Sequence, residues 1–278
     1  MQGNQTTDIA LVNDALETAV EAARSAADVI REAAPNHGSL EWVEKSSADF
    51  VTDVDRASER KITEIIHASF PGAFILGEEL TPEHRALPDA LTFIADPLDG
   101  TTNFLHGYPH YAVSIGVMHE GSLIAGVVLN VPHGDLFTAK KDQGAELNGE
   151  HIRVSSIDST SRALIGTGFP FKNPGLLDLY AKQFVAVSRE TAGIRRAGSA
   201  ALDLADVACG RFDGFWELVL APWDVAAGML LVREAGGVVT DLAGDQTAPI
   251  HGAYAAGNPQ IHKWLLTTIE QIESNETD

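Results

Sequence analysis

The sequence predicts a globular protein made of two closely packed subdomains, an α+β unit over residues 1–155 and an α/β unit over residues 156–278. Two observations predict this organisation. The stretch from Tyr111 to Val154 is rich in β-branched residues and is broken by turn signals, which is typical of an antiparallel meander. Beyond residue 155, strand-like and helix-like segments alternate, as they do in α/β folds. A cleft between two such units is a common place for an active site.

The first unit is expected to begin with two helices. Apolar side chains recur within residues 8–34 at alternating spacings of four and three residues, which predicts an amphipathic helix; they are Leu16, Val20, Ala23, Ala27 and Ile30. A second helix is expected over residues 55–70, because Pro71 and a glycine follow it. Short strands are expected at residues 73–76 and 92–95.

The second unit is expected to alternate strands and helices. The strands are expected at residues 163–168, 193–196, 212–217 and 238–241, and the helices at residues 176–190, 199–210 and 223–237 and after Pro259. Gly236 and Gly237 provide the stop for the third of these helices.

Composition and charge restrict the function. At 278 residues, of which 45% are hydrophobic, the chain can bury a sizeable core. Its formal net charge of −20 comes from carboxylates spread along most of the chain, and such a field disfavours nucleic acid and anionic membranes. We therefore expect no direct nucleic-acid partner and no membrane partner. The same field repels phosphorylated substrates, so a phosphate site here needs bound cations or a few well-placed basic groups.

Several features favour a cytoplasmic location. The single cysteine, Cys209, cannot form an intramolecular disulfide, which fits a reducing compartment. The N-terminus has no basic segment followed by an apolar core, so we expect no signal peptide. The sequence also lacks an uninterrupted apolar run of about 18 residues, the usual minimum for a membrane span.

The segment FIADPLDGTTNF, residues 93–104, places two carboxylates where an apolar run ends. Pro97 cannot donate a ladder hydrogen bond, so the strand is expected to stop near Asp96 and turn, which leaves Asp96 and Asp99 at a strand end. Gly100 allows a left-handed backbone there. The next two residues, Thr101 and Thr102, are expected to cap a short helix whose free N–H groups favour an anion.

A hard cation beside an anion is the chemistry that this segment indicates. Magnesium is typically held by one or two carboxylates together with substrate phosphate oxygens and waters. The alternative is that Asp96 and Asp99 only make Asx-type turns, which are common for aspartate before glycine. A metal cluster becomes the better interpretation because Glu78, Glu79 and Asp224 also stand at the ends of expected elements. Neither a GxSxG elbow nor a Walker A motif is present, so neither a serine triad nor nucleotide-driven phosphoryl transfer has support.

Six blocks carry a wider resemblance. They are KSSADFVTDVD, GEE, DPLDGTTNF, GTGFPF, RRAGSAALDLADVACGRFDGFWE and PWDVAAGMLLVREAGG. Together they resemble the inositol monophosphatase family, particularly its bacterial SuhB-like members, in order and in spacing over nearly the whole chain. The resemblance implies a layered αβαβα sandwich of the inositol monophosphatase and fructose-1,6-bisphosphatase type.

The resemblance also implies two or three Mg²⁺ ions in the active site. It implies surroundings of the first ion at Glu78, Asp96, the carbonyl of Leu98 and Thr101, and ligands of the second at Asp96, Asp99 and Asp224. Family members often have isoleucine where Leu98 stands, but a backbone carbonyl ligand tolerates that change. A third, weaker site would involve Glu78.

Further roles follow from the same resemblance. Glu78 and Thr101 would position or deprotonate the attacking water, and Asp55 would hydrogen-bond to that threonine or to metal-bound water. Lys45 and Glu79 fall near the site.

The substrate-binding residues are likewise implied by the resemblance. They are Gly100, Thr101 and Thr102 at the phosphate, Gly198, Ser199 and Ala200 along the inositol pocket, Glu217 at the ring hydroxyls, and Asp224. Two of them have simpler interpretations. Ser199 could be a helix N-cap, which is compatible with binding, and Glu217 could be an exposed loop acid.

The leading hypothesis is a magnesium-dependent phosphatase that hydrolyses myo-inositol monophosphates and, like the family, is inhibited by lithium. The same chemistry on histidinol phosphate, fructose 1,6-bisphosphate or a 3′-phosphoadenosine nucleotide stays open, with the nucleotide ranked last because DGTTNF looks more like the inositol branch. A third hypothesis is an interaction protein, since SuhB-like proteins are also associated with the transcription machinery. The resemblance further implies a homodimer.

Overall fold

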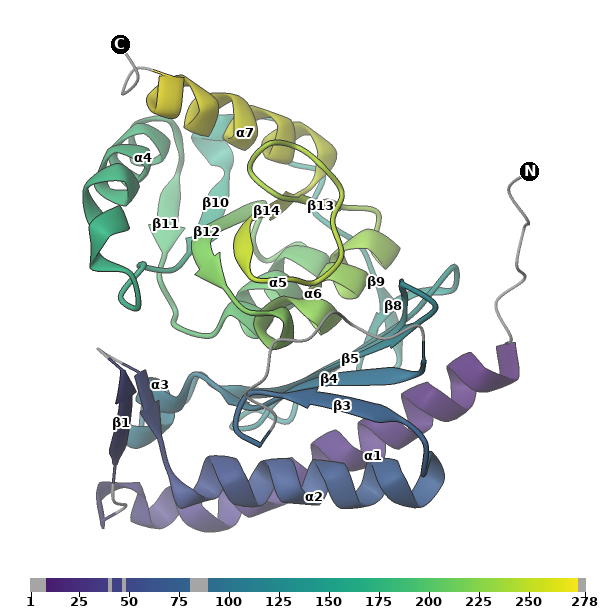
Figure 1. Ribbon diagram of the computed structural model, residues 1–278. Helices are drawn as coiled ribbons and strands as arrows, with labels where there is room; N and C mark the ends of the chain where they lie inside the picture. The colour runs from purple at the N-terminus through teal and green to yellow at the C-terminus, as the bar shows by residue number, and fades with distance from the viewer. Residues whose placement is uncertain (1–8, 40–41, 47–48, 81–89, 275–278) are drawn as a thin grey trace.

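The structure is a computed structural model that describes residues 9–39, 42–46, 49–80 and 90–274. Its helices and sheets form five layers (Figure 1). Two helices form each outer layer, and two more lie in the middle layer between the two sheets. This is the αβαβα sandwich that the resemblance implies. None of the described helices is both long enough and apolar enough to cross a membrane.

The first outer layer consists of α1 (Ile9–Ala33) and α2 (Asp53–Ser69). Their apolar faces pack on one side of the first sheet, where alanines let α1 lie close to the strands. The expected amphipathic stripe is present, but Leu16 and Val20 are only half-buried. A small two-stranded sheet that the sequence did not predict, β1 (Val43–Ser46) and β2 (Asp49–Val51), lies before α2.

The first sheet has seven strands in the order β3-β4-β5-β6-β7-β8-β9. Its strands are β3 (Phe74–Gly77), β4 (Thr92–Asp99), β5 (Ala112–His119), β6 (Ser122–Asn130), β7 (Leu136–Lys140), β8 (Gly144–Leu147) and β9 (Glu150–Ile152). Strands β3 and β4 are parallel, and each later neighbour is antiparallel. The predicted meander after residue 111 is therefore confirmed.

The middle layer contains α5 (Ala200–Ala208) and α6 (Pro222–Glu234). Nearly every residue of α6 is buried, because apolar side chains from both sheets surround it. This burial on all sides explains why α6 has no polar stripe of its own.

The second sheet has five strands in the order β11-β10-β12-β14-β13. Its strands are β10 (Leu164–Thr167), β11 (Gly193–Arg195), β12 (Gly214–Leu220), β13 (Val238–Thr240) and β14 (Gly252–Gly257). Helices α4 (Leu177–Glu190) and α7 (Pro259–Ser274) cover its outer face. The expected strand and helix alternation is confirmed, except that the sequence did not predict β14. Our proposed division near residue 155 falls in the segment between β9 and β10.

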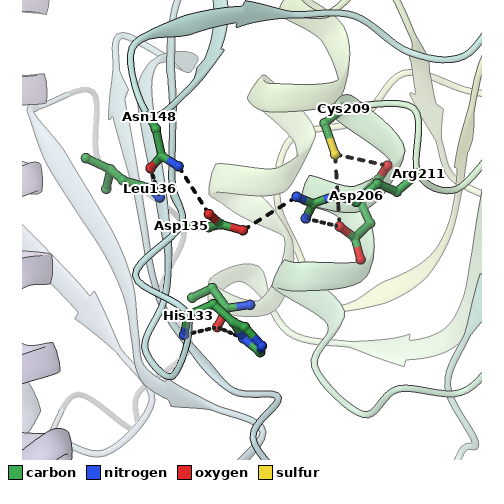
Figure 2. A network of polar contacts seen from close by, with 8 residues as sticks. His133, Asp135, Leu136, Asn148, Asp206, Cys209 and Arg211 are labelled. Carbon is green, nitrogen blue, oxygen red and sulfur yellow. Dashed lines mark hydrogen bonds and ion pairs between the residues drawn. The ribbon is translucent and has the colours of Figure 1, made fainter.

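A polar network joins the first sheet to the end of α5 (Figure 2). Arg211 forms ion pairs with Asp206 at 3.0 Å and with Asp135, just before β7, at 3.5 Å. Asn148 donates to Asp135 at 3.1 Å. Arg211 is substantially exposed, so we regard this network as an orienting contact between layers rather than a large source of stability.

Candidate active site

A cavity of about 580 Å³ lies where the ends of several strands and helices meet. Most of the residues singled out in the sequence line it, namely Glu78, Asp96, Leu98, Asp99, Gly100, Thr101, Thr102, Gly198, Ser199, Ala200, Glu217 and Asp224. Both sheets and the middle helices contribute to its walls. The cavity therefore gathers in one place residues that lie more than 100 positions apart in the chain.

Parallel pairing of β3 with β4 brings the first two carboxylates together. Gly77, the last residue of β3, pairs with Ala95 of β4. Glu78 follows Gly77 and Asp96 follows Ala95, so the two carboxylates lie beside each other at the same end of the paired strands. The parallel direction decides this, because antiparallel strands would have ended at opposite edges.

A β-bulge brings Asp99 to the same cavity as Asp96. Asp96 pairs with Ser114 of β5 and Asp99 pairs with Ala112, so β4 has one extra residue between them. Side chains alternate along a regular strand, and residues three apart would point to opposite faces. The bulge offsets that alternation. The prediction that β4 stops near Asp96 was wrong: the strand runs to Asp99, because a proline is tolerated at a bulge.

The fourth carboxylate, Asp224, comes from the first turn of α6. Its Oδ2 accepts a hydrogen bond from the Ala221 N–H at 2.7 Å, which closes the N-terminus of the helix. An acid at this position is favoured by the helix dipole. The N-cap residue itself is Ala221, and Asp224 occupies the first turn of the helix.

The cavity carboxylates repel one another. Burial, followed by repulsion from Glu78, Asp99 and Asp224, raises the pKa of Asp96 well above its usual value. Burial also raises the pKa of Asp99 to about 6, although hydrogen bonds from Ser199 and the Ala201 N–H oppose that change. The pKa of Asp224 is raised to about 7, by burial first and by Asp99 next. A cation in the cavity would relieve this repulsion.

The donor set suits a hard divalent cation. It consists of carboxylate, hydroxyl and carbonyl oxygens, which favour Mg²⁺ over softer metals. Within the described part of the chain, no three His, Cys, Asp or Glu side chains converge closely enough to form a ready-made ion site. One oxygen of Asp96 instead accepts from the Leu98 N–H at 2.9 Å, and Asp99 and Asp224 also accept from the protein. The residues fit the ion by chemistry and charge.

Helix α2 contacts Thr101 through Asp55. Its hydroxyl lies 3.1 Å from Asp55 Oδ1 and 3.0 Å from the Leu98 carbonyl oxygen. The other oxygen of Asp55 accepts from the backbone N–H and the hydroxyl of Thr52, forming a capping box at the start of α2. Burial raises the pKa of Asp55. Asp55 does not line the cavity and reaches it through Thr101.

The short helix α3 (Thr101–Leu105) begins at Gly100, which is its N-cap. The expectation that Thr101 and Thr102 cap this helix was wrong, because both lie inside it. Gly100 has a φ of +93°, a left-handed conformation that glycine adopts without a Cβ penalty. A Cβ at this position would also lie 3.1 Å from the His110 carbonyl oxygen.

The opposite wall contains Ser199 and Glu217. Ser199 is the N-cap of α5, and its hydroxyl also donates to Asp99 Oδ2, so it joins this wall to the carboxylates. Glu217 lies on β12 and its pKa is raised to about 8, chiefly by burial and then by Asp224. A Cβ at Gly168 would lie 2.2 Å from the Glu217 carboxyl group, so that group packs directly on the glycine backbone. Glu217 is half-buried on a strand, and the exposed-loop interpretation was wrong.

Sequence reasoning missed several residues that line the cavity. They are Thr167, Gly168, Phe169, Pro170, Phe171, Lys172, Arg196, Asp203, Val219, Leu220, Ala221, Trp223 and His251. Arg196 stacks on Phe169 and Phe171, with its guanidinium carbon 5.5 and 5.1 Å from the two ring centres. Asp203 is 1% exposed, and its Oδ1 has no hydrogen-bond partner among the described residues. The spacing of four residues from Ser199 to Asp203 on a predicted helix was a usable signal for Asp203.

Asp55 and Glu79 are the singled-out residues that the described part of the structure does not bring to the cavity wall. Glu79 does not line it, and its backbone N–H donates to Glu59 on α2. Lys45 lies in β1, and its side chain is outside the described part of the structure.

Comparisons of the sequence and of the structure with known proteins point to the same family. The profile described as the inositol monophosphatase family matches residues 12–274. The Nus factor SuhB of Pseudomonas aeruginosa is 46% identical over 259 residues, which cover 92% of this chain and 95% of that protein. The crystal structure of the extragenic suppressor protein SuhB from Bartonella henselae is 38% identical, with a TM-score of 0.84 over 92% of this chain and 98% of that chain. The Thermotoga maritima IMPase is 32% identical, with a TM-score of 0.84 over 94% and 99%.

Proposed function

The chain belongs to the inositol monophosphatase family, and from that premise we propose that it is a magnesium-dependent phosphomonoesterase that hydrolyses myo-inositol monophosphate to myo-inositol and phosphate. The observation that carries the proposal is the meeting of Glu78, Asp96, Asp99 and Asp224 in one cavity. Their mutual repulsion, which raises the pKa values of Asp96, Asp99 and Asp224, favours a bound cation. A cation also supplies the positive charge that this acidic protein needs to accept a phosphate.

In this proposal the carboxylates and the Leu98 carbonyl oxygen hold two or three Mg²⁺ ions. When bound, Mg²⁺ neutralises phosphate oxygens, lowers the pKa of a bound water and stabilises the leaving oxygen. Asp96 would contribute to both of the main ion sites, as the family resemblance implies, and it shares the cavity with Glu78 and Asp99. These ligands lie directly after β3, in the bulged part of β4 and in the first turn of α6, so the first sheet and α6 set their geometry.

Thr101 and Glu78 have the proposed role of directing the water. The Thr101 hydroxyl can donate to only one acceptor well, and Asp55 and the Leu98 carbonyl both offer acceptors at about 3 Å. Its oxygen lone pairs are then oriented to accept a hydrogen bond from a water in the cavity. Glu78 would accept the proton that this water loses, and the backbone N–H groups of Gly100, Thr101 and Thr102 would face the phosphate.

The polyol is proposed to lie against the second wall. Glu217 would accept hydrogen bonds from ring hydroxyls, and Gly198, Ser199 and Ala200 would line the pocket beside it. Because Gly168 leaves room only for the Glu217 carboxyl group, that acceptor is held in a definite place. A definite acceptor selects substrates that carry a hydroxyl at the matching position.

The test is phosphate release from a panel of substrates by the purified protein, with Mg²⁺ and with chelator. The panel contains myo-inositol 1-phosphate, histidinol phosphate, fructose 1,6-bisphosphate and 3′-phosphoadenosine 5′-phosphate. We expect Mg²⁺-dependent release that is greatest from the inositol phosphate and is inhibited by lithium. Dominance of another compound would keep the chemistry and replace the substrate, whereas release that persists in chelator would contradict the proposed metal dependence.

A second proposed role is contact with the transcription machinery. Its support is that relatives 43–46% identical to this chain are named Nus factor SuhB. Capture of purified RNA polymerase complexes on immobilised protein, with and without Mg²⁺ and inositol phosphate, tests this role. Failure to retain such complexes at micromolar protein would count against it. A homodimer, cytoplasmic location and the absence of direct nucleic-acid binding remain part of the same proposal.

A further inference from the structure

Glu59 is a buried acid on α2 that lies behind the cavity wall. Only 1% of its surface is exposed, although a charged side chain is seldom buried without partners. Its Oε2 accepts a hydrogen bond from the Glu79 N–H at 2.7 Å, and its Oε1 accepts one from the Leu80 N–H at 3.0 Å. Both carboxylate oxygens are thus used to hold the turn that follows β3.

The preceding residue is packed against the same carboxylate. A Cβ at Gly77 would lie 2.1 Å from Glu59 Oε1, closer than any real contact allows. The absence of a side chain at Gly77 is therefore what lets the Glu59 carboxylate enter beneath the turn. Glu59 touches the backbone on both sides of Glu78, from Gly77 to Leu80, and so restricts how the Glu78 side chain can leave the strand.

Glu59 also shares a helix face with Asp55. The two residues are four positions apart on α2, so their side chains lie one turn apart on the same side. Asp55 accepts from the Thr101 hydroxyl, and Glu59 accepts from the turn that carries Glu78. One helix thereby contacts Thr101 through Asp55 and the backbone on either side of Glu78 through Glu59.

We propose that Glu59 is a positioning residue, which orients the turn at residues 78–80 so that the Glu78 carboxylate faces the cavity. The inference rests on the proposed function and deepens it, since it names what holds the proposed base. Glu59 does not line the cavity, so it acts through Glu78 and not on the substrate.

The informative variant is Glu59→Gln. An amide has nearly the same shape but only one oxygen, so it can accept from only one of the two backbone N–H groups, and its NH₂ would face the other as donor against donor. The matched control is Glu64→Gln on the same helix, where the exposed Glu64 pairs with Lys61 at 3.0 Å and contacts no part of the cavity. Glu59→Asp serves as the second variant, because it keeps both acceptors on a shorter side chain.

The experiment combines amide hydrogen exchange at Glu79 and Leu80, Mg²⁺ titration by calorimetry, and phosphate-release kinetics on the full chain. For Glu59→Gln we expect faster exchange at those amides, weaker Mg²⁺ binding by about fivefold or more, and a kcat lower by about 10- to 100-fold with a KM within about threefold of wild type. Glu59→Asp is expected to fall between wild type and Glu59→Gln, and Glu64→Gln to match wild type.

The outcomes separate this inference from the proposed function. Wild-type protein that binds no Mg²⁺ and releases no phosphate overturns the proposed function and this inference with it. Active wild-type protein with a Glu59→Gln variant of unchanged exchange, Mg²⁺ affinity and kcat overturns this inference alone. If Glu59→Gln does not fold, the same measurements on Glu59→Asp decide the matter in the same way.

Discussion

The Thr101 hydroxyl lies 3.1 Å from Asp55 Oδ1, a contact between residues 46 positions apart in the chain. It connects the first turn of α2 to the first turn of α3, and therefore the outer helical layer to the cavity. The Thr101 hydroxyl has only one proton to donate, and the Leu98 carbonyl oxygen is a second acceptor 3.0 Å from the hydroxyl oxygen. The contact determines the direction in which the Thr101 lone pairs are presented.

Replacing Thr101 tests that relationship. Thr101→Val keeps the shape but removes the hydroxyl, so kcat is expected to fall by about 100-fold, the scale of losing one positioned proton-handling group. Thr101→Ser keeps the hydroxyl and is expected to stay within about fivefold of wild type. Steady-state phosphate release at saturating Mg²⁺ measures both. Equal activity of the Val and Ser variants would show that the hydroxyl has no role in turnover.

Removing a cavity carboxylate is expected to separate activity from stability. Asp96→Asn or Asp224→Asn should reduce turnover by on the order of 1000-fold, the scale of losing one electrostatic stabiliser, because each removes a charge that would hold Mg²⁺. Each should leave the fold intact and raise the melting temperature in chelator, because it relieves the repulsion that raises the pKa values of its neighbours. Melting curves with and without Mg²⁺ check this. Near-normal turnover in either variant would remove the metal assignment.

Changes at Glu217 are expected to alter the choice of substrate. Glu217→Gln should change the ratio of kcat/KM between inositol phosphate and the other panel compounds by about 10-fold or more, with little change in the Mg²⁺ requirement. Gly168→Ala should have a similar effect, because a methyl group there would displace the Glu217 carboxyl group. The same substrate panel measures both variants. An unchanged substrate profile in both would contradict the pocket role of Glu217.

Asp203 is expected to make stability depend on pH. Burial, and then repulsion from Glu217, Asp206 and Asp99, raises its pKa well above the usual value, while Arg196 opposes the rise. Between about pH 4 and that raised pKa, the unfolded chain has lost a proton that the folded chain still holds, so stability falls as pH rises. Asp203→Asn has no proton to lose and should gain stability relative to wild type as pH rises.

Thermal unfolding of the Asp203→Asn variant and wild type in chelator at pH 5 and pH 8 measures this difference. The titrating groups far from Asp203 are shared and largely cancel in the comparison, whereas any change at Glu217, Asp206 or Asp99 belongs to the same repulsion. We expect the melting temperature of the variant, relative to wild type, to be higher at pH 8 than at pH 5. A difference that does not change with pH would mean that Asp203 titrates normally.

Local patterns predicted most of the elements well. The spacing of Ala23, Ala27 and Ile30 predicted a helix face that is fully buried, and the meander and the alternating second half were also predicted correctly. The sequence did not predict β14, and its composition explains why. Its sequence, GAYAAG, consists mainly of glycine and alanine, which strands disfavour, yet it lies between β12 and β13 inside the second sheet. Its small residues are accepted there because the neighbouring layers cover it on both sides.

Part of the candidate site could also be predicted from local sequence patterns. Asp96 precedes a proline, Asp99 precedes a glycine and Asp224 lies two residues after Pro222, and such local signals can be read from the sequence alone. Glu59 gives no such signal, because it is an acid within an ordinary helical pattern, and Asp203 gives only its spacing of four residues from Ser199. Their roles depend on what packs against them, and that is set by contacts between distant segments.

By itself the sequence determined the order of most helices and strands, the acidic composition, and the residue types gathered in the DPLDGTTNF and PWD segments. Periodicity and turn chemistry act over a few residues, so one chain is enough to read them. Only the tertiary structure decided that β3 runs parallel to β4 and that a bulge brings Asp99 to the same cavity as Asp96. It also decided that Asp55 of α2 contacts Thr101 in the cavity wall. These relationships arise from pairing and packing between segments far apart in the chain, where no local pattern specifies the partner.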